Sequence, residues 1–297
     1  VEVTLGYDDA TGYEAGLGNA FGASVGRNAN RIGGAVIEIN GTEYHLTKND
    51  GENNLHSGLD FYHGRMWKVA DADDTHVTFE MDSPDGDQGY PGALVMKVTY
   101  SLDEENTLMI HYEAEPDQDT IINMTNHSYF NLNGHKSGDV LNHTLWLNAD
   151  AFTPADAASI PTGEIRSVEG TPMDFRTDKT IGKDIEADYE PLVFGNGYDH
   201  NWVLKNEGEF DKVAEVAGDE SGIHMSVLTD LPGVQIYTAN FLDGVKGRDG
   251  AVYEMRDAIC LETQYYPDAI HHENFPGPIC KKGEKYDTRT AYRFRVK

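Results

Sequence analysis

The chain has 297 residues, of which 39% are hydrophobic and 25% are charged, and its 51 acidic and 23 basic side chains give a formal net charge of −28. This excess of acid argues against a nucleic-acid partner, because neutralisation of phosphates needs a basic face. It also disfavours an anionic membrane surface as a partner. A chain of this length buries roughly three quarters of its unfolded surface, so its core needs neither disulfides nor a metal.

The cysteine content and the hydropathy bear on the cellular compartment. Cys260 and Cys280 are too few for a disulfide framework, and we expect both to be reduced, with a single bridge between them as the alternative. The sequence contains no apolar run of 18 residues, so we expect no transmembrane helix. It also contains no recognisable signal peptide. We therefore expect a cytoplasmic protein.

Short runs rich in Val, Ile, Thr and aromatic residues predict β-strands along most of the chain. A hairpin is predicted at Asn40-Gly41, and a second one at residues 103–106. The predicted strands are residues 36–39, 76–81, 94–102, 107–113, 120–124, 143–147, 201–204, 222–228, 234–238, 258–263 and 291–296.

Helical periodicity is scarce, and only residues 9–15 and 181–189 could form short helices. Parallel sheets need crossover helices between their strands, and the segments between these strands are too short and too polar for them. We therefore predict an all-β fold, a large single-domain antiparallel β-sandwich over residues 1–297.

Two other kinds of catalytic site are not supported by the sequence. Residues 22–26 match the nucleophile-elbow pattern around Ser24, but that motif needs a following helix, and residues 27–34 are a poor helix. Twelve histidines raise the question of a metal, but there is no HExxH motif, and no phosphate-binding loop is present either. We predict no metal and no cofactor.

Three stretches, residues 120–132, 198–202 and 258–266, place polar side chains where a strand should be apolar. If the first stretch is extended, Asn123, Thr125 and His127 share one face. In the third stretch, Glu262 shares a face with Cys260 and Gln264, while the residues between them are apolar. Aromatic, amide and carboxylate groups together suit a sugar, whose ring faces are apolar and whose edges carry hydroxyls.

These stretches resemble motifs of the aldose 1-epimerases, the galactose mutarotases. The resemblance implies the galactose mutarotase-like supersandwich. The family usually has further β-structure before the position of Val1, so we expect this chain to lack that N-terminal segment. The matching segments occur in order and cover nearly the whole chain: residues 26–32, 54–58, 83–92, 125–132, 171–176, 198–201, 232–241, 261–264 and 267–269.

The resemblance implies an isomerase that interconverts the α and β anomers of a free hexose, galactose or glucose, with a small-molecule aldose as its partner. Ring opening needs a base for the O1 proton and an acid for the ring oxygen O5, and it needs no cofactor. By the family's motifs, Glu262 is the base and His127 is the acid. Arg31 and His56 position the sugar, Asp199 binds its hydroxyls, and Gln264 is a weaker candidate ligand.

We expect burial to raise the pKa of Glu262 and neighbouring negative charge to raise the pKa of His127, with a bell-shaped rate profile as the result. For Arg31, an ion pair with a nearby carboxylate is the structural alternative to a ligand role.

Three alternative functions stay open at this point. One is a non-catalytic sugar-binding protein of the same fold. Another is a glycoside hydrolase that uses Asp199 and Glu262 as its carboxylate pair. The third is an epimerase of hexose 6-phosphates, which would need additional cations at the site. The sequence indicates neither the preferred hexose nor the oligomeric state.

Overall fold

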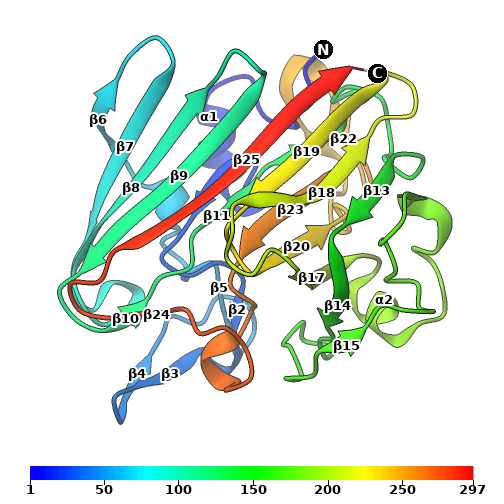
Figure 1. Ribbon diagram of the computed structural model, residues 1–297. Helices are drawn as coiled ribbons and strands as arrows, with labels where there is room; N and C mark the ends of the chain where they lie inside the picture. Colours follow the sequence, from blue (N-terminus) through cyan, green and yellow to red (C-terminus); the bar gives the residue numbers. More distant parts are fainter. Residues whose placement is uncertain (297) are drawn as a thin grey trace.

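The computed structural model of the chain describes residues 1–296, and most of its strands belong to two large antiparallel sheets. The larger sheet has nine strands and runs across the molecule in Figure 1, from β6 at the left to β13 at the right. In spatial order its strands are β16 (Lys179–Thr180), β13 (Thr144–Leu147), β18 (Asp211–Ala217), β19 (Ile223–Thr229), β25 (Tyr286–Val296), β9 (Thr107–Pro116), β8 (Leu94–Leu102), β7 (His76–Ser83) and β6 (Lys68–Ala72).

The second sheet has six strands and carries the residues on which the function depends. Its strands are, in order, β12 (Tyr129–Phe130), β23 (Ile259–Gln264), β20 (Gly233–Tyr237), β17 (Asp199–Leu204), β14 (Ala149–Thr153) and β15 (Arg166–Ser167).

The main hydrophobic core lies between these two sheets. Met96 and Tyr292 from the nine-stranded sheet are buried in the same cluster as Ile236 and Leu261 from the six-stranded sheet. The Tyr292 hydroxyl also donates a hydrogen bond across the layer to the carbonyl of Leu261 at 3.0 Å. Because side chains alternate along a strand, the other face of the six-stranded sheet is left for polar groups.

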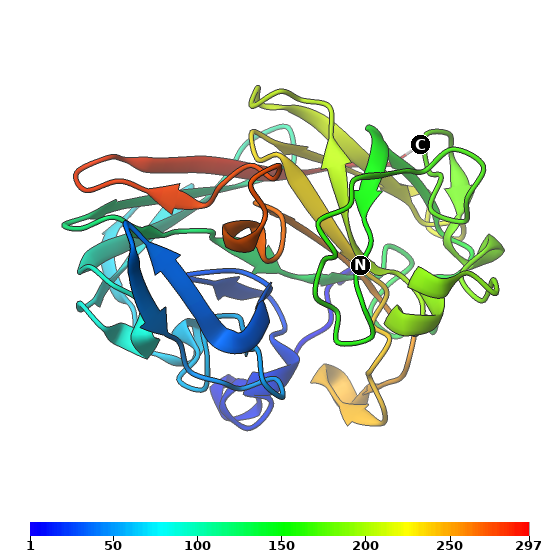
Figure 2. The same cartoon turned by 90° about the horizontal axis from the view of Figure 1, so that it is seen from below.

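Five pairs of short strands complete the fold and bring distant loops to that polar face. Figure 2 shows that the N-terminal segments (blue) lie together on one side of the nine-stranded sheet. The pairs are β1 (Ala23–Val25) with β11 (Thr125–His127), β2 (Arg31–Ile32) with β5 (Asn54–Leu55), β3 (Val36–Ile39) with β4 (Thr42–His45), β10 (Thr120–Ile121) with β24 (Ile279–Cys280), and β21 (Val245–Lys246) with β22 (Val252–Tyr253).

The predicted all-β antiparallel architecture is confirmed, and so is the hairpin at Asn40-Gly41, where both residues have positive φ as a two-residue turn requires. The strand predicted at residues 120–124 ends at Ile121. Beyond it the chain changes partners, since the Ile122 amide donates to the carbonyl of Pro278 and the Asn123 amide to that of Arg27.

Residues 1–296 contain two short α-helices, α1 (Ala10–Ala15) and α2 (Glu190–Gly195). The first agrees with the prediction, but the helix predicted at residues 181–189 is wrong. That segment contains only a 3₁₀ turn at Ile181–Lys183, and the helix begins after it. Pro191 lies in the first turn of α2, where its missing N–H is tolerated. Its ring would clash with a preceding helical turn, so a helix that starts earlier in the chain cannot run through this position.

Both cysteines are free and buried, as expected. Within residues 1–296, no helix combines the length and the hydropathy needed to cross a lipid bilayer.

Candidate active site

Glu262 lies on the polar face of β23, in the middle of a strand whose six residues are all buried. Its neighbours Ile259 and Leu261 pack into the core between the sheets, whereas Cys260, Glu262 and Gln264 face away from it, as the alternation in the sequence predicts. Glu262 is only 2% exposed, and its Oε2 atom has no hydrogen-bond partner among the described residues. A buried carboxyl group without a full set of partners is a candidate for proton transfer.

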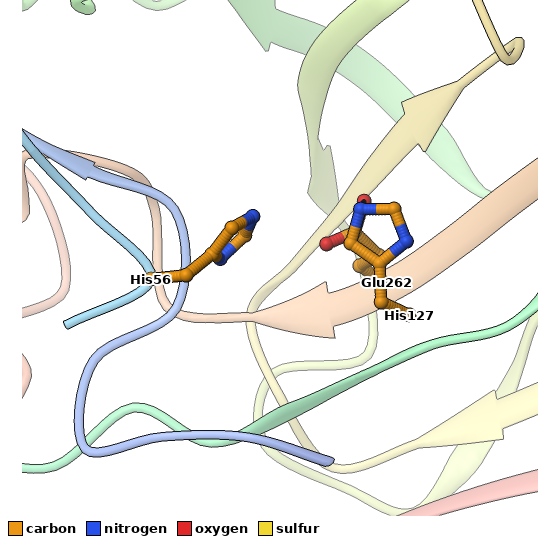
Figure 3. Close-up of side chains that lie close together, drawn as sticks. All are labelled: His56, His127 and Glu262. Atoms are coloured by element: carbon orange, nitrogen blue, oxygen red, sulfur yellow. Dashed lines mark ion pairs between the residues drawn. The ribbon is translucent and has the colours of Figure 1, made fainter. Parts of the chain in front are cut away.

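His127 lies directly beside this carboxyl group. Its Nε2 atom is 3.5 Å from Oε1 of Glu262. The pairing of β11 with β1 places His127 opposite Ala23, and its ring stacks on Tyr129 with centroids 5.0 Å apart. Figure 3 shows both side chains on the same side of the site. Backbone pairing and aromatic packing together hold the imidazole against the carboxyl group.

His56 approaches the pair from the loop that follows β5. Its side chain points toward the other two in Figure 3, and its ring meets the ring of His127 edge to face at 5.7 Å. The Nδ1 atom of His56 accepts a hydrogen bond from the backbone N–H of Asn30 at 3.1 Å. An imidazole that accepts at Nδ1 carries its proton at Nε2 when it is neutral. His56 therefore offers an N–H donor to a ligand.

Arg31 and Asp199 are near the pair, although they lie on different elements. The Nε atom of Arg31 forms an ion pair with Asp50 at 2.7 Å, so the structural alternative predicted for this residue is present. Burial raises the pKa of Glu262 and of Asp199, and the charge of Arg31 opposes both rises. Arg31 thus forms an ion pair with Asp50 and also acts electrostatically on the carboxyl groups of the site.

Gln264 and Gln235 extend the polar face on neighbouring strands. Gln264 is completely buried, and neither its oxygen nor its nitrogen has a partner among the described residues. Gln235 pairs with Glu262 in the sheet register and donates from Nε2 to Oδ1 of Asp199 at 2.7 Å. Our sequence analysis missed Gln235 and also Asn30, which orients His56. A glutamine between the apolar residues 234 and 236 was the available signal.

The other polar residues singled out in the sequence have structural roles. The Thr125 hydroxyl donates to the carbonyl of Thr263 at 2.7 Å, which ties β11 to β23. The Ser24 hydroxyl shares a hydrogen bond with the hydroxyl of Tyr100, and no helix follows β1, so the nucleophile-elbow reading is excluded. Each of the three polar stretches contributes to the site: the first supplies His127, the second supplies Asp199, and the third supplies the polar face of β23.

Burial controls the protonation of the central pair. It raises the pKa of Glu262 well above the ordinary range, and the negative charge of Asp199 adds to this effect. It also lowers the pKa of His127 to about 4. The expected rise at Glu262 is confirmed, whereas the expected rise at His127 is wrong, because burial removes water from around the imidazolium and the charge of His63 adds to the lowering. Over a wide pH range the two groups therefore hold one proton between them.

Two groups of side chains have the donor atoms for a metal. Ligand atoms of His56, His127 and Glu262 lie within 4.8 Å of one another, as do those of three residues on β9 and β25, namely His111, Glu113 and Asp287. In the first group, however, Nδ1 of His56 is occupied by the Asn30 amide, so its other nitrogen carries a proton and is not free to ligate. This group is better suited to donate and accept hydrogen bonds than to hold a metal.

Comparisons with known proteins identify one family along nearly the whole chain. The aldose 1-epimerase family profile matches residues 1–293. Galactose mutarotase from Bos taurus is 43% identical over 296 residues, which is 99% of this chain and 84% of that protein. Aldose 1-epimerase from Escherichia coli K12 is 38% identical over 277 residues, which is 92% of this chain and 80% of that protein.

Solved structures show the same fold. An aldose epimerase homologue from C. elegans superposes with a TM-score of 0.91 and 31% identity, over 99% of this chain and 88% of the other. Galactose 1-epimerase from Lactobacillus acidophilus gives a TM-score of 0.86 and 28% identity, over 99% and 85% of the two chains. The chain belongs to the aldose 1-epimerase family, and it is an epimerase that interconverts the anomers of aldoses.

Proposed function

We propose that this chain interconverts the α and β anomers of a neutral free hexose, galactose or glucose, with Glu262 as general base and His127 as general acid. The observation that carries this assignment is the buried contact of 3.5 Å between Nε2 of His127 and Oε1 of Glu262. The O1 and O5 atoms of a cyclic aldose are bonded to the same carbon, so the two groups that serve them must be neighbours. A buried acid and base at this separation meet that requirement.

Ring opening uses the one proton that the pair shares. The raised pKa of Glu262 and the lowered pKa of His127 favour this proton on Glu262 at rest. The reacting form has the proton on Nε2 of His127, and Glu262 is then a carboxylate that accepts the proton of the O1 hydroxyl. His127 then protonates O5 as the C1–O5 bond breaks, and an open-chain aldehyde forms. The low-dielectric surroundings favour such a transfer, because no charge has to leave the site.

Ring closure returns both groups to their starting state. Rotation about the C1–C2 bond presents the opposite face of the aldehyde to the O5 hydroxyl. As O5 attacks C1, its proton returns to His127, and Glu262 gives its proton to the former aldehyde oxygen. The cycle needs neither a redox partner nor exchange of protons with water, since acid and base are regenerated together.

The groups around the pair suit a neutral sugar. We propose that His56 donates to a sugar oxygen, that Asp199 and Gln264 bind hydroxyls, and that Arg31 positions the ring. The Arg31 Nε atom is already paired with Asp50, which leaves little free positive charge for a phosphate group. This supports a neutral hexose over a hexose 6-phosphate.

Polarimetry of freshly dissolved α-D-galactose and α-D-glucose tests the proposal. The protein should speed the approach to the same final rotation as buffer alone, and Glu262→Gln should lower the rate by ~10²-fold or more, on the usual scale of general acid–base catalysis. The rate ratio of the two sugars ranks them. If neither sugar responds to the wild-type protein, the activity is not that of a hexose mutarotase, and the non-catalytic alternative is favoured.

A further inference from the structure

Cys260 contacts the side of His127 that the proposed reaction does not use. Its Sγ atom lies 3.6 Å from Nδ1 of His127, while Glu262, two residues further along the same strand face, lies 3.5 Å from Nε2. The imidazole is thus held between two side chains of β23, one at each ring nitrogen. Cys260 is completely buried and belongs to a small apolar cluster that includes Tyr129 and Tyr237.

A thiol beside an imidazole is also the arrangement of a cysteine nucleophile, but this cysteine is not activated. Burial raises the pKa of Cys260 well above the ordinary range, and the charges of Glu262 and Asp199 raise it further. A nucleophilic cysteine needs the opposite, an electropositive and partly exposed surrounding. Cys260 therefore stays a neutral thiol whose sulfur has lone pairs available at the distance of a weak hydrogen bond.

We propose that Cys260 is a positioning residue whose sulfur accepts a hydrogen bond from the Nδ1–H group of His127. The Nε2 atom is then the nitrogen that takes up and releases the mobile proton. This inference rests on the proposed function, because it assigns the proton transfer to Nε2. Burial lowers the pKa of His127, and a hydrogen bond from the ring to the residue's own backbone carbonyl opposes this shift. The contact of Cys260 with Nδ1 is the observation that assigns the proton to that atom.

The chemical identity of this acceptor affects the acid strength of His127. A carboxylate at Nδ1 would strongly stabilise the imidazolium form and raise its pKa, as in the Asp–His pairs of serine proteases. A sulfur atom is a weak, uncharged acceptor, so it orients the ring and leaves the imidazolium a strong acid.

The other titratable side chains around His127 do not place a carboxylate at Nδ1. The titratable groups that face the ring come from several elements and include no further carboxylate: Glu262 and Cys260 on β23, Tyr129 on β12, Tyr237 on β20, His56 in the loop after β5, and His63 (Tyr62–Gly64 turn).

Two substitutions separate positioning from packing. Cys260→Ala removes the acceptor, and Cys260→Ser keeps one, with oxygen as the stronger acceptor. We expect the alanine variant to lose about tenfold in kcat with little change in KM, on the scale of one hydrogen bond. The serine variant should retain most of the activity. The acid limb of the pH profile should move to lower pH in the alanine variant and to higher pH in the serine variant.

The tautomer itself is measured without sugar. In ¹⁵N-labelled protein, the His127 signals, identified by their loss in His127→Asn, should report a proton on Nδ1 in the wild type and in Cys260→Ser. Cys260→Ala should show a mixture of the two tautomers. The matched control is Cys280→Ala, which removes the other buried cysteine. The Cys280 thiol donates to the carbonyl of Glu284 at 3.3 Å and has no contact with His127.

The outcomes distinguish the inference from the proposed function. If the wild-type protein does not speed mutarotation, the proposed function fails, and the tautomer measurement still tests the role of Cys260. If the wild-type protein is active and His127 carries its proton on Nε2, the inference is overturned. It is also overturned if Cys260→Ala keeps both the wild-type tautomer and the wild-type acid limb. If the alanine variant does not fold, the acid limb of the pH profile of Cys260→Ser tests the inference. A shift to higher pH supports it, and no shift or a shift to lower pH overturns it.

Discussion

Asn30 donates its backbone N–H to Nδ1 of His56 over 3.1 Å, and this single bond determines which ring nitrogen of His56 faces a ligand. Both residues have left-handed backbone conformations, with φ of 62° and 50°. Burial and the neighbouring His127 and Arg31 lower the pKa of His56 well below its ordinary value, so the ring is neutral at physiological pH. A neutral imidazole with its donor turned toward the site can bind a sugar oxygen but cannot readily supply a proton.

The first prediction concerns this donor. His56→Asn should lower kcat/KM by ~10²-fold, because a hydrogen bond to the reacting sugar is lost, while asparagine tolerates the left-handed backbone. Mutarotation rates measured over a range of galactose concentrations check this result. The matched control is His45→Asn, because the His45 side chain is 75% exposed on β4, and it should behave like the wild type. Equal kcat/KM for both variants would contradict a ligand role for His56.

The second prediction concerns the pH dependence of kcat/KM. Activity requires one proton shared by Glu262 and His127. Below a pH of about 4 both groups are protonated, and no base is available for O1. Above the raised pKa of Glu262 both groups lose their protons, and no acid is available for O5. The acid limb should therefore lie near pH 4 and not near ~6.5, the ordinary value for histidine.

Initial rates in a constant-ionic-strength buffer series from pH 3 to 10 check this prediction, with refolding controls at the acid end. An acid limb close to that of free histidine would mean that burial does not govern the pair.

The third prediction concerns Arg31. Its charge lowers the pKa of Glu262 and of Asp199, so Arg31→Met should raise both. The basic limb of the profile should then move to higher pH, and KM should rise as a sugar contact is lost. Arg166→Met, which breaks an ion pair with Glu164 at the surface, serves as the control. A basic limb that stays in place in Arg31→Met would show that the guanidinium does not act on the pair.

The fourth prediction concerns stability. Arg27 is completely buried, and its guanidinium donates to the carbonyls of Pro91 and Gly92 at 2.8 and 2.9 Å and to the hydroxyl of Ser83 at 2.6 Å. Arg27→Met removes the buried charged donor from these three acceptors, so the free energy of unfolding should fall by about 3 kcal/mol.

Urea unfolding measures this change. Arg176→Met, which removes a partly exposed ion pair with Asp174, should cost less than about 1 kcal/mol. Similar losses in both variants would argue against a structural role for the buried hydrogen bonds of Arg27.

Much of the fold could be predicted because it depends on local patterns. The run at residues 94–102 coincides with β8, and Asn40-Gly41 forms the expected hairpin, since both reflect preferences of the backbone itself. The helix predicted at residues 181–189 is absent, and α2 begins only at Glu190. Pro191 is a signal in the sequence for that later start, and the prediction did not use it. The strand at 120–124 ended early because its hydrogen-bond partners changed along the chain.

The same division holds for the candidate site. By itself, the sequence determined the family and the alternation of polar and apolar residues along the strand that contains Glu262. It also determined the identity of the residues that we propose for catalysis and binding. Only the tertiary structure decided that Cys260 and Glu262 lie at opposite nitrogens of His127, that Gln235 joins Asp199, and that the pKa of His127 falls. The physical reason is that contacts and desolvation depend on which distant segments pack around a group, and residue type and spacing along the chain do not contain that information.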